Sequence, residues 1–247
     1  MLSRNFKLQR VGDYDWLAQN YKFSTIAFSI DELIIIDVTR ENRDLSNFIE
    51  MIKKITKDCF VPITAGGGIN SLQEASLLLK SGADKVLLNS LLYKNPEEVS
   101  AIANRFGNQS IVASVDLKKQ DGDYKVLINN GVDDINISAK DWLKNISNMN
   151  IGEVYLNSIN QDGTAQGLDL EMLDLLGTNF PVPLILSGGA GHHNHLYEAF
   201  ADTRVDAVAT AHLFNFVGDG LKQCREGLIS KGMSLAKWED FATINLK

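Results

Sequence analysis

The chain has 247 residues, of which 45% are hydrophobic and 22% are charged, and its formal net charge is −7. This size and composition suit one globular domain over residues 1–247. The acidic balance excludes broad nucleic-acid binding, which needs a basic face. No apolar run is long enough to cross a bilayer, and the N-terminus lacks the apolar core of a signal peptide. We therefore expect a cytoplasmic protein with no membrane partner.

Short β-rich runs alternate with amphipathic stretches along the chain, which is typical of a parallel sheet with crossover helices. Ser71 and Glu74 predict a capping box at the start of one helix, which Gly82 ends. Asn95 and Gly107 predict the ends of the next helix. The pattern predicts an α/β fold of the (β/α)₈ TIM-barrel type. The predicted strands are Asp31–Val38, Val61–Gly68, Lys85–Ser90, Ile111–Leu117, Glu153–Ser158, Val182–Gly189 and Asp206–Ala211.

An internal repeat supports the barrel. The stretch VPITAGGG begins at Val61, and VPLILSGG begins at Val182, about 121 residues later. This spacing predicts two half-barrels, the second of which starts with the strand IVASVDL at Ile111. The corresponding first strand of the first half is missing or divergent. Either the native start lies upstream or the protein works with an open or repaired barrel, and we favour a short or divergent N-terminus because an unpaired edge is costly.

Both glycine turns fall where barrel enzymes carry their chemistry, at the C-terminal ends of strands. Glycines without a Cβ let phosphate oxygens reach backbone N–H groups, and the following helix N-terminus adds a favourable dipole. The alternative is that glycine only permits a tight turn. The repetition favours two phosphate sites, built from Gly67, Gly68, Asn89 and Ser90 on one side and from Gly188, Gly189, Ala211 and His212 on the other.

Asp116 ends an otherwise apolar strand, so we expect its carboxylate to emerge into the mouth of the barrel. Partial desolvation there raises a carboxyl pKa toward the range of a general acid or base. The alternative is an aspartate that bonds only its own loop. Asp162, beside Gly163, offers a second acid or a plain Asp-Gly turn.

Glu32, Lys85 and Glu153 open strands and therefore point to the opposite, N-terminal mouth. They form either a salt-bridged gate or ordinary strand-end charges. No metal or cofactor site is expected. Cys59 and Cys224 are isolated, and the histidines of GHHNH, which are His192, His193 and His195, have no carboxylate at ligand spacing.

Several motifs together resemble the cyclase subunit (HisF-like) family of imidazole glycerol phosphate synthase. They include IDELIIIDVT, AGGGI, GADKVLLNS, GEVYLNSI and SGGAG, and the similarity runs from about Asn5 to the C-terminus. The resemblance implies a (β/α)₈ barrel of histidine biosynthesis that takes ammonia from a glutaminase (HisH-like) partner. From a bisphosphorylated ribulosyl substrate it makes imidazole glycerol phosphate and an aminoimidazole carboxamide ribotide, without a cofactor.

Carried over by position, the resemblance implies that Asp116 is one of two catalytic aspartates. It also implies that Glu32, Lys85 and Glu153 belong to the gate for ammonia. One phosphate site takes Gly68, Asn89 and Ser90, and the other takes Asp162, Gly163, Gly189, Ala211 and His212.

The departures from the family pattern leave alternatives open. The sequence lacks the first strand with the other catalytic aspartate, the gate arginine and a phosphate-binding lysine, and Asn160 and Gln161 replace an Asp-Arg pair. These changes resemble the WbuZ-type paralogues, which are associated with amidation of a surface-polysaccharide sugar. A catalytically impaired scaffold that activates its glutaminase is a further alternative. An isomerase of the same pathway shares the fold but does not need the gate charges.

Overall fold

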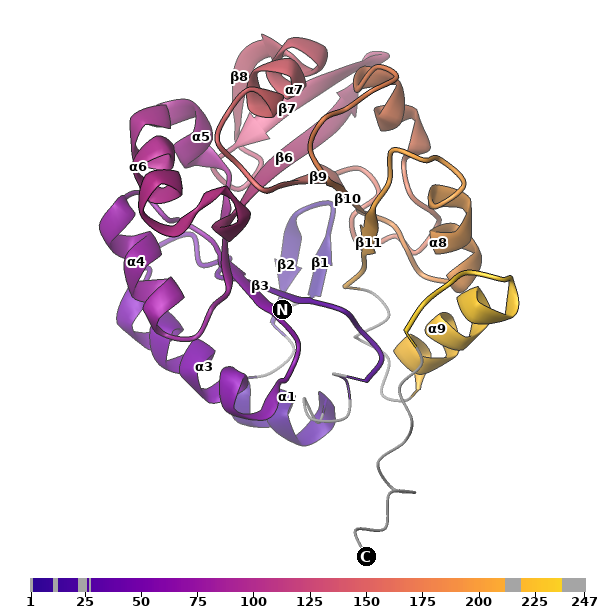
Figure 1. The fold of residues 1–247 in the computed structure, drawn as a ribbon, viewed down its shortest axis with the longest axis horizontal. Coiled ribbons are helices and arrows are strands. Elements are labelled where there is room, and N and C mark those ends of the chain that lie inside the picture. Colours follow the sequence, from indigo (N-terminus) through magenta and orange to yellow (C-terminus); the bar gives the residue numbers. More distant parts are fainter. Residues whose placement is uncertain (1, 11–12, 22–25, 27, 212–218, 237–247) are drawn as a thin grey trace, which may run out of the picture.

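The computed structural model describes residues 2–10, 13–21, 26, 28–211 and 219–236. In this part of the chain, seven parallel strands form one sheet in which neighbours in the sequence are neighbours in space (Figure 1). All seven predicted strands are present. They are β3 (Leu33–Ile36), β4 (Ile63–Gly66), β5 (Lys85–Leu88), β6 (Ile111–Gln120), β9 (Glu153–Ser158), β10 (Leu184–Ser187) and β11 (Ala207–Ala209).

Most strands are shorter than the apolar runs that predict them, because pairing stops where the chain turns into a loop. Strand β6 is longer than predicted. Its C-terminal half pairs antiparallel with β7 (Asp123–Ile128), which pairs in turn with β8 (Asp133–Ser138). The alternation rule predicts strand type but not this extension, since β6 continues as the polar stretch Lys118–Gln120.

Helices surround the sheet (Figure 1). Ser71 caps α4 by accepting from the N–H of Glu74, and Gly82 follows that helix with φ of 110°. Asn95 caps α6, and Gly107 ends it with φ of 87°. Both predicted pairs of helix boundaries are therefore confirmed. The helices are α1 (Tyr14–Tyr21), α3 (Leu45–Asp58), α4 (Leu72–Lys80), α5 (Ser90–Lys94), α6 (Pro96–Phe106), α7 (Ala139–Ser147), α8 (His193–Ala199) and α9 (Gly220–Ser230), with 3₁₀ turns η1 (Asn108–Ser110) and η2 (Leu170–Leu175).

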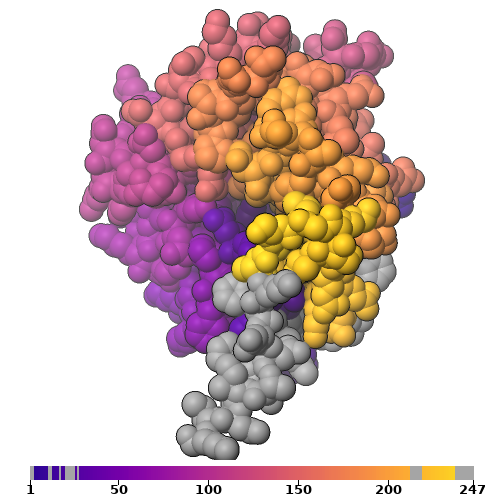
Figure 2. All heavy atoms as spheres, turned by 45° about the vertical axis from the view of Figure 1, so that its right-hand side comes forward, coloured from indigo at the N-terminus to yellow at the C-terminus, as the bar shows by residue number. Residues whose placement is uncertain are grey.

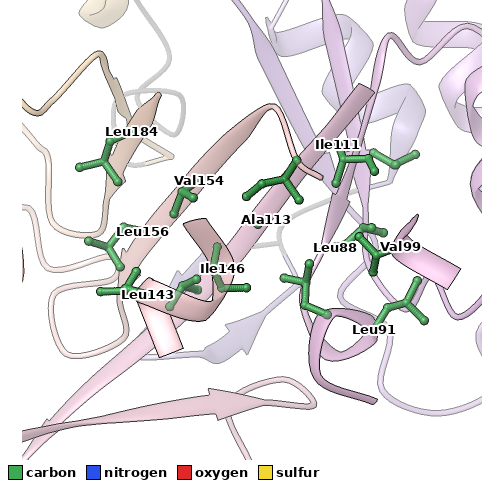
Figure 3. Packing of buried hydrophobic residues seen from close by; sticks show 14 of the residues in the cluster. Leu88, Leu91, Val99, Ile111, Ala113, Leu143, Ile146, Val154, Leu156 and Leu184 are labelled. Carbon is green, nitrogen blue, oxygen red and sulfur yellow. The ribbon is translucent and has the colours of Figure 1, made fainter. Parts of the chain in front are cut away.

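The outer face of the sheet packs against the helices. Because side chains alternate along a strand, every second residue of each strand faces this layer. Val154 and Leu156 of β9 lie beside Leu143 and Ile146 of α7, and Leu88 of β5 lies near Leu91 and Val99 (Figure 3). These side chains are 3% exposed or less, so this layer forms the main core.

The inner face of the sheet has its own apolar cluster, which shows how strongly the sheet is curled. Leu87 of β5, Val112 of β6 and Ile185 of β10 form its buried centre. Ile34 of the first strand and Ala207 of the last strand both pack against this cluster. The two ends of the sheet therefore contribute to one interior. The fold is α/β, with a parallel and strongly curled sheet.

The first and last parts of the helical ring meet beside the ends of the sheet. Arg225 of α9 donates two hydrogen bonds to Asp31, just before β3, at 2.9 and 3.0 Å. Figure 2 shows the yellow α9 next to the indigo N-terminal part of the chain. Within the described residues, β3 and β11 each pair with one neighbour, so no eighth strand joins them.

A short hairpin of β1 (Leu2–Arg4) and β2 (Lys7–Gln9) lies within the ring in the view of Figure 1. Asn5 and Phe6 form its turn, both with positive φ, as a tight two-residue hairpin requires. This hairpin was not predicted, because strands of three residues carry too little pattern. Among the described helices, none is both long and apolar enough to cross a membrane.

Candidate active site

Asp116 lies on the inner face of β6, at the C-terminal end of the parallel sheet. Its side chain is buried, with 9% of the residue exposed. Asn157 of β9 donates to Oδ1 at 3.1 Å, and Asn89, just after β5, donates to Oδ2 at 3.2 Å. Each carboxylate oxygen is thus held by an amide from a neighbouring strand, which fixes the orientation of the carboxyl group.

Burial raises the pKa of Asp116 from 3.8 to about 7. The hydrogen bond from Asn157 opposes this shift, and the nearby charge of Asp162 adds to it. The predicted direction of the pKa shift is confirmed. The side chain of Asp116 is more deeply buried than we expected for a residue at the mouth of the barrel. A carboxyl group with this pKa is present in both protonation states at neutral pH, as a general acid or base must be.

Asp162 is close enough to affect Asp116, but its carboxylate is already engaged. Oδ2 accepts from the hydroxyl of Ser3 at 2.5 Å and from the N–H of Phe6 at 3.1 Å. The N–H of Asn5 donates to the backbone oxygen of Asp162 at 2.9 Å. Asp162 therefore anchors the β1–β2 hairpin at this end of the sheet, which the sequence did not suggest.

The hairpin reaches the other side of the site through Arg40, which follows β3 and donates to the backbone oxygen of Phe6 at 2.8 Å. The ring of Phe6 also lies against Gly131, where an added Cβ would come within 2.7 Å of it. Gly163 leaves room for the backbone of Ser3 in the same way. The hairpin therefore spans the loops at the C-terminal ends of β3, β7 and β9.

The first glycine turn, after β4, is filled by protein atoms. A Cβ on Gly67 would lie 2.1 Å from the backbone oxygen of Asp37. At Gly68, the position of a Cβ falls within the guanidinium of Arg43, so this side chain lies against the turn. The absence of a side chain at Gly68 thus makes room for Arg43. The arginine lies in the space where the sequence predicts a phosphate group.

The second glycine turn, after β10, packs against backbone. A Cβ on Gly188 would lie 2.6 Å from the backbone oxygen of Ser158, and one on Gly189 would lie 2.0 Å from that of Gly167. The N–H of Gly167 also donates to the oxygen of Gly189 at 2.9 Å. Here the glycines let two neighbouring loops approach closely, in line with the tight-turn alternative.

The residues predicted to complete the phosphate sites have separate roles in the structure. Asn89 turns inward to Asp116, and Ser90 accepts from the backbone N–H of Asn129 at 3.0 Å. Ala211 is exposed after β11. His212 lies outside the described residues.

At the opposite end of the sheet, Lys85 joins Glu32 and Glu153. Its ammonium group lies 2.5 Å from Glu32 Oε1 and 2.6 Å from Glu153 Oε1. Burial alone would lower the pKa of Lys85, but the hydrogen bonds to the two glutamates outweigh it and the pKa is raised. The prediction of a salt-bridged cluster at this end is confirmed, in preference to unconnected strand-end charges.

Between the two ends, the interior is mainly apolar. Tyr155 lies between the lysine cluster and Asp116, and its hydroxyl is 2.7 Å from Ser187 Oγ. Burial raises the pKa of Tyr155, against a smaller opposite effect of the bond to Ser187. The tyrosine is therefore neutral at physiological pH.

Two of the histidines after the second turn, His192 and His195, act as hydrogen-bond acceptors. His192 Nδ1 accepts from the N–H of Asn194 and caps α8, and His195 Nδ1 accepts from the N–H of Gly191. Within the described ranges, no group of three or more potential ligands could hold a metal ion.

Sequence reasoning missed Asp37 and Arg43, the pair at the first turn, and Asn157. Asp37 ends the apolar strand LIIID, the same signal that singled out Asp116. Asn157 could have been identified by strand parity, because it faces the same side of the sheet as Glu153. No local signal predicts that Arg43, six residues beyond Asp37, lies on Gly68.

The comparisons with known proteins define the class of this chain. The family model described as "Histidine biosynthesis protein" matches residues 7–218. The chain belongs to this family, whose members are TIM barrels.

Within the family, the chain is a homologue of the HisF subunits of imidazole glycerol phosphate synthase. It is 45% identical to the provisionally named imidazole glycerol phosphate synthase subunit hisF2 of Parasynechococcus marenigrum, over 96% of this chain and 88% of that protein. It is 36% identical to the HisF subunit of Chlorobaculum tepidum, over 83% and 82%. It is 35% identical to that of Natranaerobius thermophilus, over 93% and 90%. The resemblance inferred from the motifs is confirmed.

Proposed function

We propose that this HisF-type chain uses ammonia from a glutaminase partner to convert a phosphorylated substrate, as in the formation of imidazole glycerol phosphate in histidine biosynthesis. The observation that carries this proposal is the arrangement along the sheet. A buried carboxyl group with a pKa of about 7 lies at one end, and a Lys85–Glu32–Glu153 cluster lies at the other, with a mainly apolar interior between them.

In this proposal Asp116 is the acid/base group. Ammonia attacks an electrophilic carbon as a neutral nucleophile, and the adduct must lose a proton from nitrogen. A carboxylate whose pKa is near 7 can accept that proton and later return one to a leaving oxygen. Asn89 and Asn157 hold the carboxyl group in place, so its reorientation costs little during the reaction.

The cluster at the N-terminal end is the proposed entry for ammonia, and the partner subunit docks there. A gate of this kind needs ion pairs that can form and break. A lysine that is paired with two glutamates meets this requirement. Beyond it, the apolar side chains of Leu87, Val112 and Ile185 disfavour ions and admit a small neutral molecule.

We infer that the architecture is a single-domain (β/α)₈ barrel over residues 1–247, made of two half-barrel repeats with the first strand missing or divergent. The support is the curled order of the seven parallel strands and the similar glycine turns after β4 and β10. The turns, with Asn89 and Ser90 on one side and Gly163, Ala211 and His212 on the other, are the proposed phosphate sites. Asp162 contributes through the hairpin that it anchors.

A second candidate is a paralogue that transfers ammonia to a different acceptor, such as a surface-polysaccharide sugar. It is favoured by the higher identity to the hisF2 protein, 45%, than to the HisF subunits of Chlorobaculum tepidum and Natranaerobius thermophilus, 36% and 35%. A scaffold that only activates its glutaminase is a third candidate, and it would release glutamate without converting the substrate.

The test combines the purified chain with a HisH-type glutaminase, glutamine and the ribulosyl bisphosphate, and follows glutamate and cyclised product. We expect both to form. Lys85→Met should reduce turnover with glutamine more than turnover with ammonium chloride, because only the first depends on the entry. Glutamate release without cyclised product would overturn the histidine-pathway assignment and favour the paralogue.

A further inference from the structure

We propose that the guanidinium of Arg43 is the cationic contact for a phosphate group at the first glycine turn. The inference rests on the proposed function, because it names the group that binds one phosphate of that substrate. Arg43 lies between β3 and α3 in the sequence, yet its side chain covers Gly68, after β4. Its side chain is 26% exposed, so it is accessible from solvent.

The guanidinium contacts the loop that carries it. Nη2 donates to the backbone oxygen of Thr39 at 2.9 Å and approaches that of Asp37 at 3.5 Å. Nε is 3.2 Å from Asp37 Oδ2, close enough for an ion pair but without hydrogen-bond geometry. None of these contacts uses Nη1, the nitrogen that lies on Gly68. Arg43 is therefore positioned in advance and keeps donors for a ligand.

The N-terminus of α4 is poorly suited to bind the phosphate by itself. The N–H of Leu72 donates to the carboxylate of Glu98 at 2.5 Å, and that of Asn70 donates to Glu74 at 2.7 Å. The N–H of Glu74 donates to Ser71. These amides are occupied, and the two glutamates repel an anion. A phosphate at this turn therefore needs a positive charge from another part of the chain.

Arginine suits this task. Its planar guanidinium presents several N–H donors that match the spacing of phosphate oxygens. Because Gly68 has no side chain, the group can lie against the turn. The ligand class that this arrangement recognises is a phosphomonoester or a free phosphate ion.

Binding of inorganic phosphate, measured by titration calorimetry, tests the proposal without requiring turnover. Arg43→Gln should weaken phosphate binding by about 10- to 100-fold, the range for a lost charge-assisted hydrogen bond. Arg43→Lys should weaken it less, because the charge remains. Arg105→Gln, which removes the same charge from the exposed face of α6, is the matched control and should leave binding unchanged.

Gly68→Ala provides a second, independent variant. The added methyl group must displace the guanidinium, so it should weaken binding as much as Arg43→Gln does. If both act on one contact, the double variant should bind no worse than either single variant. Thermal unfolding of each variant shows that the fold is retained.

Unchanged phosphate affinity in a folded Arg43→Gln protein would overturn the proposal, and so would fully additive losses in the double variant. If the chain binds phosphate in an Arg43-dependent way but does not cyclise the ribulosyl substrate, the proposed function fails and this inference stands. With an active enzyme, Arg43→Gln should raise KM for the substrate much more than it lowers kcat, since binding is the affected step.

Discussion

The two glycine turns have similar sequences but different surroundings. After β4, Gly68 lies against the guanidinium of Arg43, which is a positively charged side-chain group. After β10, Gly189 lies against the backbone of Gly167, which is neutral and cannot move without the loop. The same motif therefore admits a charged side chain in one half of the sheet and joins two loops in the other. A repeated motif shows common geometry, and its neighbours decide what it binds.

The largest expected effect is at Asp116, the carboxyl group at the same end of the sheet as both turns. Asp116→Asn should lower kcat by about 100- to 10,000-fold, the usual contribution of a general acid or base. If the wild-type carboxylate acts as the base, kcat/KM should rise with pH up to about 7, and this rise should be absent in the variant. Initial rates over a pH series give both values. If the Asp116→Asn variant turned over substrate at the wild-type rate, Asp116 would not be the catalytic acid or base.

Asp116 should also make folding stability depend on pH. Its pKa is about 7 in the folded protein and 3.8 for an unperturbed aspartate, so the folded state holds the proton more tightly. Its stabilising contribution is present below about pH 4 and is lost as the pH rises through 7. The free energy of unfolding of Asp116→Asn, relative to wild type, should increase by on the order of 4 kcal/mol over that window. Urea unfolding at several pH values measures this difference, and a flat difference would contradict the burial of the ionising group.

Matched alanine substitutions test the contrast between the turns directly. Gly189→Ala should cost about 3 kcal/mol or more of stability, because its Cβ meets a backbone oxygen at a φ of 100°. Gly68→Ala, at a φ of 63°, should cost about 1 kcal/mol, because a side chain can move away. Urea unfolding compares the two. Equal losses of stability would mean that the second turn is as adaptable as the first.

The smallest effect expected is at the hairpin anchor near the second turn. Asp162→Ala removes the acceptor for Ser3 and Phe6 and should destabilise the hairpin locally by about 1–2 kcal/mol. Hydrogen exchange of the Phe6 amide should become about 10-fold faster, with little change in global unfolding. Asp174→Ala, at an exposed aspartate, serves as the control. Unchanged exchange at Phe6 would show that Arg40 holds the hairpin without Asp162.

Much of the fold could be predicted from local pattern. The seven parallel strands and the caps at Ser71 and Asn95 follow from side-chain alternation and capping chemistry, which act over a few residues. The inward direction of Asp116 and the common end of Glu32, Lys85 and Glu153 follow from the same parity rule. The β1–β2 hairpin and the antiparallel extension of β6 could not be predicted, because their strands are short or polar and are stabilised by contacts far away in the sequence.

By itself, the sequence determined the class of fold, the family and the inward direction of Asp116 near the end of the parallel pairing, because these depend on spacing along the chain. Only the tertiary structure decided what fills each glycine turn, which amides hold Asp116 and that Asp162 anchors the hairpin. Those contacts join residues from separate loops, such as Arg43 with Gly68 and Ser3 with Asp162. The physical reason is that a glycine only lacks a Cβ and so leaves space. Which group fills that space depends on how the curled sheet places the neighbouring loops.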